Sequence, residues 1–269
     1  MKNIKIIILL SLLFVMEVFA ENPITPIKNP KSEMEIVVAV AANFKNPMEE
    51  IRLAFLKLNP EANIKLIFGA SGQLTNQIQN GAPVDIFLSA DMDFPLALYK
   101  DGYGLHQPKV YAVGVLVLFS QKEIDKLKSI SELLLSDNIK FIAIANPKTA
   151  PYGKAAVETL QSLGIYEKLK HKFVFGESIT QVNQFISTGS ADVGFSSFST
   201  LYGNEDTFRY WKQVDSTTYS TIHQGLIIIH TKETKSEEEK ITINKLFDFL
   251  FSSETKSILL KYGYKIPDK

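Results

Sequence analysis

The feature that most constrains the fold is a regular alternation of short apolar runs with helical patterns, which begins at Glu35. The run Glu35–Ala41 (EIVVAVA) is typical of a buried strand, and Asn46 with Pro47 suits the N-cap and first residue of a following helix. The alternation continues with strands at Ile64–Phe68, Asp85–Leu88 and Tyr111–Phe119, and with helices at Gly72–Asn80 and Phe94–Lys100. Strands and helices that alternate at this spacing predict parallel βαβ units with right-handed crossovers.

A second series of the same kind follows. Strands are expected at Lys140–Ala145, Phe173–Phe175, Asp192–Phe195 and Gly225–His230, and helices at Tyr152–Leu163, Ile179–Ser187 and Ile241–Phe251, the last after a Ser236/Glu239 capping box. Residues 79–89 (QNGAPVDIFLS) and 187–196 (STGSADVGFS) form a weak repeat, which turn chemistry alone could also produce. The pattern therefore predicts two similar α/β lobes. Lobe I is expected to comprise 35–112 and 226–269, lobe II 113–225, and the crossover strands to lie near 111–119 and 219–230.

The N-terminal segment has the pattern of a secretory signal peptide. Lys2 and Lys5 precede the apolar run Ile6–Val15, and small residues follow, so residues 1–20 are expected to be removed. The alternative is an uncleaved anchor, although the run is short for a membrane span. Residues 21–34 are expected to be a flexible leader. The chain has no cysteine, which excludes a lipobox lipid anchor, disulfides and thiol catalysis, and the mature protein is expected in the periplasm.

Three strand-to-helix turns are the candidate binding elements: Ala41–Asn46, Gly69–Gly72 and Asn146–Gly153. In an open parallel sheet these turns lie at the carboxyl ends of strands, where ligands bind. Each presents free backbone N–H groups and the positive end of a helix dipole. Ser71 is expected to be an N-cap whose hydroxyl donates to a ligand, with Gly72 allowing close backbone approach. The alternative for Ser71 is a plain helix cap.

The donor set in these turns favours a fully deprotonated oxyanion. The chain has 29 basic and 29 acidic residues, so nothing in its overall charge points to nucleic acid, and an anion must be attracted locally. Neutral donors can solvate a dianion in a cleft. Hydrogen phosphate would need an acceptor, for which Asp91 and Glu177 are the candidates. Tyr152 either closes over a ligand or packs in the core.

Catalytic patterns are weak by comparison. The sequence contains no G-x-S-x-G, H-E-x-x-H or P-loop motif, and its four histidines (His106, His171, His223 and His230) are scattered. Asp85 and Asp192 could form a carboxylate pair, but structural roles in the turns are favoured. An exported hydrolase with Ser71 as nucleophile remains an alternative, although no histidine lies near the three turns in sequence. Binding without catalysis is the favoured interpretation.

Four motifs resemble the periplasmic molybdate-binding protein of ABC uptake transporters. They are VAANF (40–44), GASG (69–72), QIQNGAPVDIFLSAD (77–91) and NPKTAPYGKAA (146–156), and the resemblance extends from about Ile36 to Ile266. It implies a type II periplasmic binding fold that closes around molybdate, and also tungstate, for delivery to a permease in the inner membrane. It further implies a monomer with no cofactor and no nucleic-acid partner. Sulfate, chromate or phosphate are the alternative tetrahedral ligands.

The resemblance also assigns the ligand contacts. The family's first-turn hydroxyl position falls at Ala42 or Asn43, so Asn43 would contribute its amide or backbone N–H and Ala42 at most its backbone. Ser71 would donate through side chain and backbone, and Tyr152 and Ile179 through their backbone N–H groups. No residue would coordinate the metal directly, since molybdate is held through its oxygens. Ser197 stands where some members have a tyrosine.

Overall fold

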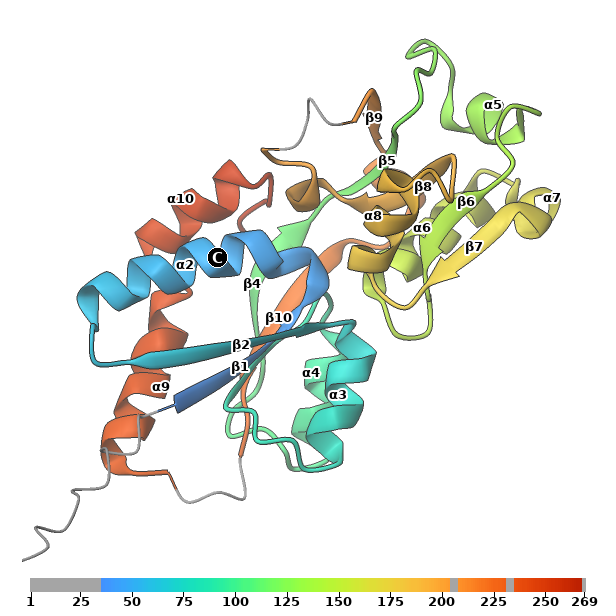
Figure 1. Cartoon of the computed structure of the whole chain (residues 1–269). Helices are drawn as coiled ribbons and strands as arrows, with labels where there is room; N and C mark the ends of the chain where they lie inside the picture. Colours follow the sequence, from blue (N-terminus) through green and yellow to red (C-terminus); the bar gives the residue numbers. More distant parts are fainter. Residues whose placement is uncertain (1–34, 204–207, 231–234, 268–269) are drawn as a thin grey trace, which may run out of the picture. The chain divides into compact units, whose positions relative to one another are not determined.

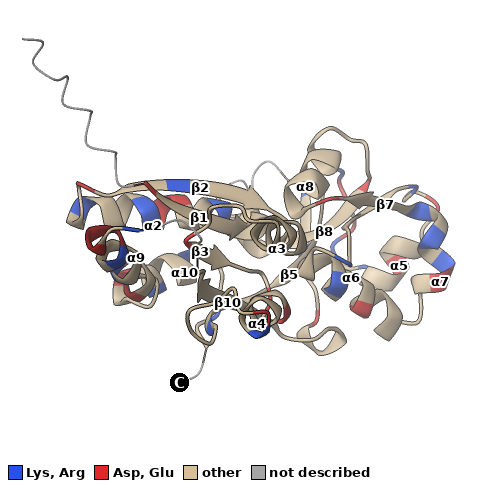
Figure 2. Ribbon diagram, turned by 90° about the horizontal axis from the view of Figure 1, so that it is seen from below, with Lys and Arg blue, Asp and Glu red and all other residues tan. Residues whose placement is uncertain are grey.

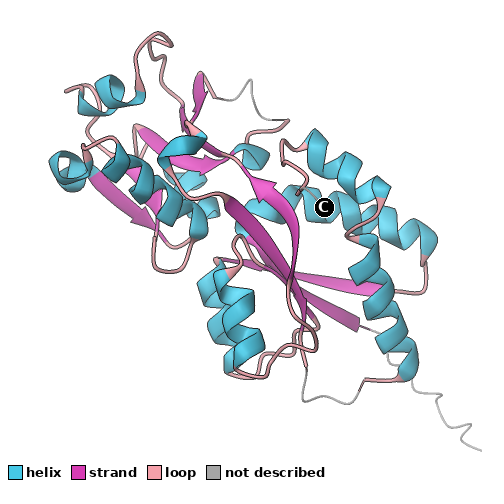
Figure 3. Cartoon of the chain, turned by 180° about the vertical axis from the view of Figure 1, so that it is seen from behind, coloured by secondary structure: helices cyan, strands magenta, loops and turns pink. Residues whose placement is uncertain are grey.

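The computed structural model describes residues 35–203, 208–230 and 235–267, which belong to one unit of the chain. These residues form two five-stranded sheets, each flanked by helices (Figure 1 and Figure 3). Within the described ranges, no helix combines the length and apolar character needed to cross a membrane. The signal peptide and leader predicted for residues 1–34 lie outside the described residues.

The first sheet has the strand order β2-β1-β3-β10-β4. Its strands are β1 (Glu35–Ala41), β2 (Asn63–Gly69), β3 (Ile86–Leu88), β4 (Lys109–Gly114) and β10 (Ile222–Ile228). Strands β1, β2 and β3 are parallel, whereas β10 runs antiparallel to both of its neighbours. The predicted βαβ units are therefore present, with one reversed strand near the edge.

Helices cover both faces of the first sheet because successive residues of β1 point to opposite sides. On one face Ile36, Val38 and Val40 pack with helices α2 (Lys45–Leu58), α9 (Glu237–Phe249) and α10 (Ser253–Lys261). On the other face Val37 and Ala39 pack with α3 (Ser71–Gln79) and α4 (Asp93–Lys100). Helix α2 begins at Lys45, after the 3-10 turn η1 (Ala42–Phe44), so the prediction of Asn46 as its N-cap is wrong.

The second sheet repeats the arrangement, with the order β7-β6-β8-β5-β9. Its strands are β5 (Leu116–Ser120), β6 (Ile142–Ala145), β7 (Phe173–Gly176), β8 (Val193–Ser197) and β9 (Tyr210–Gln213). The helices between them are α5 (Ile130–Leu135), α6 (Pro151–Ser162), α7 (Tyr166–Leu169) and α8 (Ile179–Ser187). Here β5 is the reversed strand, in the same fourth position as β10 in the first sheet.

The chain passes between the sheets twice. The single strand predicted over Tyr111–Phe119 is wrong in one respect, because it is interrupted at Val115: β4 belongs to the first sheet and β5 to the second. The return runs from β9 to β10. These two crossings join the lobes of a type II periplasmic binding protein fold, in which each lobe is a mostly parallel sheet flanked by helices.

Asp85 and Asp192 have the structural roles favoured from the sequence, and they come directly before strands of different sheets, β3 and β8. The Asp85 carboxylate accepts a hydrogen bond of 2.8 Å from the Val37 N–H, and the Asp192 carboxylate accepts one of 2.8 Å from the Phe141 N–H. Each also pairs with a lysine side chain. Both aspartates thus tie the start of a strand to its neighbour at equivalent places in the two lobes.

Candidate functional site

A small cavity with a volume of about 10 Å³ lies at the carboxyl ends of strands from both sheets. It is lined by Ala41, Ala42, Asn43, Gly69, Ala70, Ser71, Ala90, Ala150, Pro151, Tyr152 and Ile179. This set includes all five predicted contact residues and contains no acidic or basic side chain. The volume is near that of one water molecule. A larger ligand therefore requires the lining residues to move slightly apart.

Helix N-termini from both lobes face this cavity. Ser71 is the first residue of α3, Tyr152 the second of α6 and Ile179 the first of α8. None of the three N-cap residues caps its helix with a side chain, and helix N-terminal N–H groups have no intrahelical partner. These groups and the helix dipoles give the cavity a positive potential without a cation. Helix α3 carries no charged residue at all (Figure 2).

The Ser71 hydroxyl is held as a donor. The prediction of Ser71 as the N-cap is wrong by one residue, since Ala70 occupies that position. The Ser71 Oγ is not a cap acceptor but accepts a hydrogen bond of 3.0 Å from the Ala90 N–H. Ser71 is 1% exposed and lines the cavity. Among the described residues no acceptor is found for the Ser71 hydroxyl proton, so this proton is free for an acceptor in the cavity.

Gly72 serves a contact between the lobes and not the ligand approach expected from the sequence. Its N–H donates to the Thr149 carbonyl oxygen at 2.9 Å. A Cβ at this position would lie 2.9 Å from both Thr149 Cα and Phe94 Cζ. A glycine is therefore needed because the loop before α6 packs directly on the first turn of α3.

The Asn43 amide is committed to a buried network. Its Nδ2 donates to Gln224 Oε1 at 3.1 Å and to the Tyr264 hydroxyl at 2.9 Å. The backbone carbonyl oxygen of Asn43 accepts from the Ser199 hydroxyl at 2.7 Å. Of the two contributions expected from Asn43, the backbone N–H is thus the one left for a ligand.

The Tyr152 side chain packs in the core and does not close over the cavity. Tyr152 is 1% exposed, and its hydroxyl accepts a hydrogen bond of 3.1 Å from Gln224 Nε2. A Cβ on Gly114 would come within 2.2 Å of that hydroxyl oxygen, so the ring depends on a glycine in β4. Burial raises the pKa of the Tyr152 phenol well above its usual value. The phenol therefore stays neutral, and the backbone of Tyr152 is the part suited to an anion.

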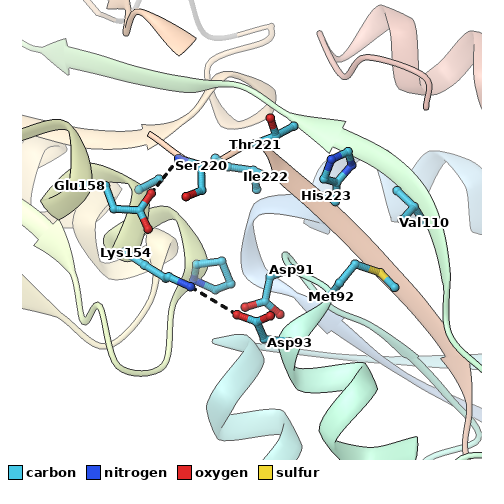
Figure 4. Close-up of a pocket in the computed structure, with 12 residues that line it drawn as sticks. Asp91, Met92, Asp93, Val110, Lys154, Glu158, Ser220, Thr221, Ile222 and His223 are labelled. Atoms are coloured by element: carbon cyan, nitrogen blue, oxygen red, sulfur yellow. Dashed lines mark hydrogen bonds and ion pairs between the residues drawn. The ribbon is translucent and has the colours of Figure 1, made fainter. Parts of the chain in front are cut away.

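The two candidate phosphate acceptors do not line this cavity. The Asp91 carboxylate accepts from the Ser89 hydroxyl at 3.1 Å and the Phe94 N–H at 3.2 Å, and burial raises its pKa to about 6. Asp91 lines a separate pocket of about 380 Å³ (Figure 4). Asp93 and Lys154 also line this pocket, and their ion pair connects α4 of the first lobe with α6 of the second. Glu177 is exposed.

Other candidate chemistries find no support at the cavity. None of the four histidines lines it, and the partner of the Ser71 oxygen is a backbone N–H and not a base. His223 lines the neighbouring pocket instead. Among the residues that the structure describes, no group of three His, Asp or Glu side chains could hold a metal ion. Ser197 hydrogen-bonds to Ser199 at 3.0 Å and lies outside the lining.

Two α/β lobes joined by two crossings, with helix N-termini of both lobes around a shared cavity, define a periplasmic-type solute-binding protein. The chain belongs to the family of bacterial extracellular solute-binding proteins, whose family model matches residues 36–265. That match spans both lobes and every residue of the cavity.

Similar proteins carry more specific names. The chain is 37% identical to the molybdate-binding protein ModA of Rhodobacter capsulatus, over 87% of this chain and 90% of that protein. It is 39% identical to ModA of Azotobacter vinelandii, over 86% and 89%. The solved structure of the periplasmic molybdate-binding protein of Azotobacter vinelandii matches with a TM-score of 0.78 at 29% identity, covering 87% of this chain and 100% of that one.

Three residues around the site were not predicted: Gln224, Tyr264 and Ser199. All three hydrogen-bond to Asn43, and Gln224 also hydrogen-bonds to Tyr152. The sequence contains one signal for Gln224, which is a lone amide within the apolar strand HQGLIII. A buried amide needs hydrogen-bond partners, so such a residue marks a polar contact inside the core. Tyr264 and Ser199 carry no comparable signal.

Proposed function

We propose that this chain binds molybdate, and also tungstate, and delivers it to an ABC transporter permease. The observation that carries the proposal is the cavity, which joins helix N-termini of both lobes and has no charged side chain in its lining. Two relatives at 37% and 39% identity are named molybdate-binding proteins. Binding, and not catalysis, is the role of the family.

The donors act together on a tetrahedral dianion. The Ser71 hydroxyl and the backbone N–H groups of Asn43, Tyr152 and Ile179 supply hydrogen bonds, and Ala42 contributes at most its backbone. Hydrogen bonds to a charged group are worth about 1.5–3 kcal/mol each. Donors from both lobes favour the closed arrangement only when the ligand is present between them, so binding shifts the lobes toward closure.

The absence of acidic side chains from the cavity lining favours a fully deprotonated ligand. A protonated anion would bring an O–H group against donors, and an unmatched buried group costs about 1–3 kcal/mol. Hydrogen phosphate is therefore disfavoured. Sulfate and chromate have the shape and charge of molybdate, and discrimination among these dianions rests on how far the lining residues separate.

The cellular setting completes the proposal. Residues 1–20 act as a cleaved signal peptide, 21–34 as a leader, and the mature chain works in the periplasm as a monomer. The lobe boundaries follow the two sheets, so lobe I comprises 35–114 and 222–267 and lobe II comprises 115–221, a few residues from the bounds expected from the sequence. The membrane partner is the permease, which receives the ion from the closed protein.

A thermal-shift panel tests the ligand. A ligand that binds the native state raises the melting temperature in proportion to the logarithm of its concentration above Kd. Molybdate and tungstate at micromolar concentrations are expected to raise it, whereas phosphate is not. Sulfate and chromate form the two remaining arms. A shift with phosphate and none with molybdate would refute the proposal, and titration calorimetry with sodium molybdate gives the affinity.

A further inference from the structure

One side-chain amide connects the two halves of the cavity. Gln224 lies in β10 and is fully buried, at an irregularity where the pairing with β4 shifts register. Its Oε1 accepts from Asn43 Nδ2 at 3.1 Å and from the Tyr111 hydroxyl at 2.8 Å. Its Nε2 donates to the Tyr152 hydroxyl at 3.1 Å.

The orientation of this amide is coupled to that of the Asn43 amide. An amide oxygen has two lone pairs, and Asn43 and Tyr111 use both of them. If the amide were turned over, the Gln224 NH2 group would face the Asn43 NH2 group, and two donors would oppose each other in a buried site. The Gln224 side chain therefore acts as a fixed connector.

The connector joins elements that belong to different lobes. Asn43 follows β1 in the first lobe, whereas Tyr152 lies in the first turn of α6 in the second. Tyr111 lies in β4 and Gln224 in β10, which are the first-sheet strands at the two crossings between lobes. Asn43 and Tyr152 line the cavity, and Gln224 does not. Gln224 thus hydrogen-bonds to one lining residue from each lobe without lining the cavity itself.

We propose that Gln224 is a positioning residue, which sets the first-turn and third-turn donors at the spacing that the oxyanion needs. This inference rests on the proposed function. It assigns to Gln224 an effect on ligand affinity that exceeds its effect on the stability of the free protein. Rigid packing supports this role, since the Phe44 ring packs edge-on against the rings of Tyr111 and Tyr264 at centroid distances of 5.0 and 5.4 Å.

The first test uses Gln224→Glu and sodium molybdate. A protonated glutamic acid has the shape of glutamine and can make the same contacts, with its O–H replacing the N–H toward Tyr152. A carboxylate instead places a negative charge behind the anion site. Burial raises the pKa of such a carboxyl group, so both forms are accessible in the assay. The ratio of Kd in Gln224→Glu to Kd in the unaltered protein is expected to rise at least about tenfold between about pH 5.5 and about pH 8.

No other group near Gln224 reproduces that profile. The side chains that face it are the phenols of Tyr111 and Tyr152, with Tyr264 beyond Asn43, and burial raises the pKa of all three above the range of the assay. His223, the preceding residue in the strand, is exposed on the opposite side. The Asp91 backbone oxygen accepts a hydrogen bond of 3.1 Å from the Gly225 N–H, and burial raises the pKa of its carboxyl group to about 6. Both proteins are therefore compared in an Asp91→Asn background, which removes the titration of Asp91 from the ratio.

The second test compares Tyr152→Phe with its matched control, Tyr111→Phe. Each change removes one hydroxyl bonded to the same amide, but only Tyr152 belongs to the second lobe. We expect similar losses of melting temperature in the ligand-free proteins. Tyr152→Phe is expected to weaken molybdate binding about three- to tenfold, through faster dissociation, because one hydrogen bond contributes about that factor. Tyr111→Phe is expected to stay within about twofold.

The outcomes separate this inference from the proposed function. If the unaltered protein does not bind molybdate, the proposed function fails and the inference fails with it. If the unaltered protein binds molybdate, but the Kd ratio for Gln224→Glu is independent of pH, only the inference is overturned. Equal effects of Tyr152→Phe and Tyr111→Phe on Kd would likewise reduce Gln224 to a residue that only stabilises the fold.

Discussion

Replacing Ser71 with alanine separates two roles that one hydroxyl plays in this structure. The Ser71 oxygen accepts the Ala90 N–H at 3.0 Å, and its proton is free to donate into the cavity. Ser71→Ala therefore removes a hydrogen bond to a charged ligand, worth about 1.5–3 kcal/mol. At about 1.4 kcal/mol per tenfold, the Kd for molybdate is expected to rise about 10- to 150-fold.

The same change also affects the free protein. The Ala90 N–H loses its acceptor, and a buried unsatisfied donor costs about 1–3 kcal/mol of unfolding free energy. Calorimetric titration with molybdate measures the affinity, and denaturant unfolding without ligand measures the stability. Ser89→Ala is the matched control, because Ser89 is also fully buried but contacts Asp91 and does not line the cavity. At about pH 8, well above the Asp91 pKa of about 6, the control is expected to lose stability and keep its affinity.

The comparison between these two variants decides the argument. If Ser71→Ala binds molybdate within about twofold of the unaltered protein, the hydroxyl does not donate to the ligand. Its role would then be limited to holding the Ala90 N–H. If Ser89→Ala weakens binding as strongly as Ser71→Ala, the loss reflects general destabilisation of the loop and not a missing donor.

Three further predictions concern charge and close packing. Burial raises the Asp91 pKa from 3.8 to about 6, and Asp91 follows Ala90, which lines the cavity. Because a bound dianion favours the protonated form of Asp91, molybdate affinity should fall as the pH rises through about 6. Calorimetric titrations of Asp91→Asn should show a weaker dependence on pH. Burial opposes ionisation of Asp192, but hydrogen bonds from a lysine and two backbone N–H groups outweigh it and lower its pKa below 3.8. The ionised Asp192 carboxylate therefore stabilises the folded protein above its ordinary pKa, and this stabilisation is lost as the pH falls through the lowered pKa. In denaturant unfolding, Asp192→Asn should lower the unfolding free energy by about 1–2 kcal/mol at neutral pH, and the difference should become smaller in acid. Gly72→Ala places a Cβ 2.9 Å from the Thr149 backbone and so disturbs the contact between the lobes beside the cavity. Molybdate binding should weaken at least about tenfold, and an unchanged Kd in calorimetric titration would contradict this prediction.

The alternation of strands and helices was readable because it depends on local spacing. The Ser236/Glu239 capping box is present at the start of α9, and the strands at Glu35–Ala41 and Ile142–Ala145 lie within their predicted runs. The interruption at Val115 was not predictable, since an unbroken apolar run has the same pattern whether it pairs within one sheet or two. The same reason explains why the reversed direction of β10 carried no sequence signal.

The residues of the site were more predictable than the roles of their side chains. Backbone N–H groups at helix starts follow from local sequence, so turns that are far apart in the chain could be assigned to one cavity. The use of the Asn43 amide depends on Gln224 and Tyr264, which lie 181 and 221 positions away. Local patterns contain no information on such partners. What the sequence does contain is an amide inside an apolar strand, and a buried amide must find partners with defined geometry. Around an anion site without charged residues, these partners determine which polar groups remain free, so the network behind the cavity decides its donor set as much as the turns that line it.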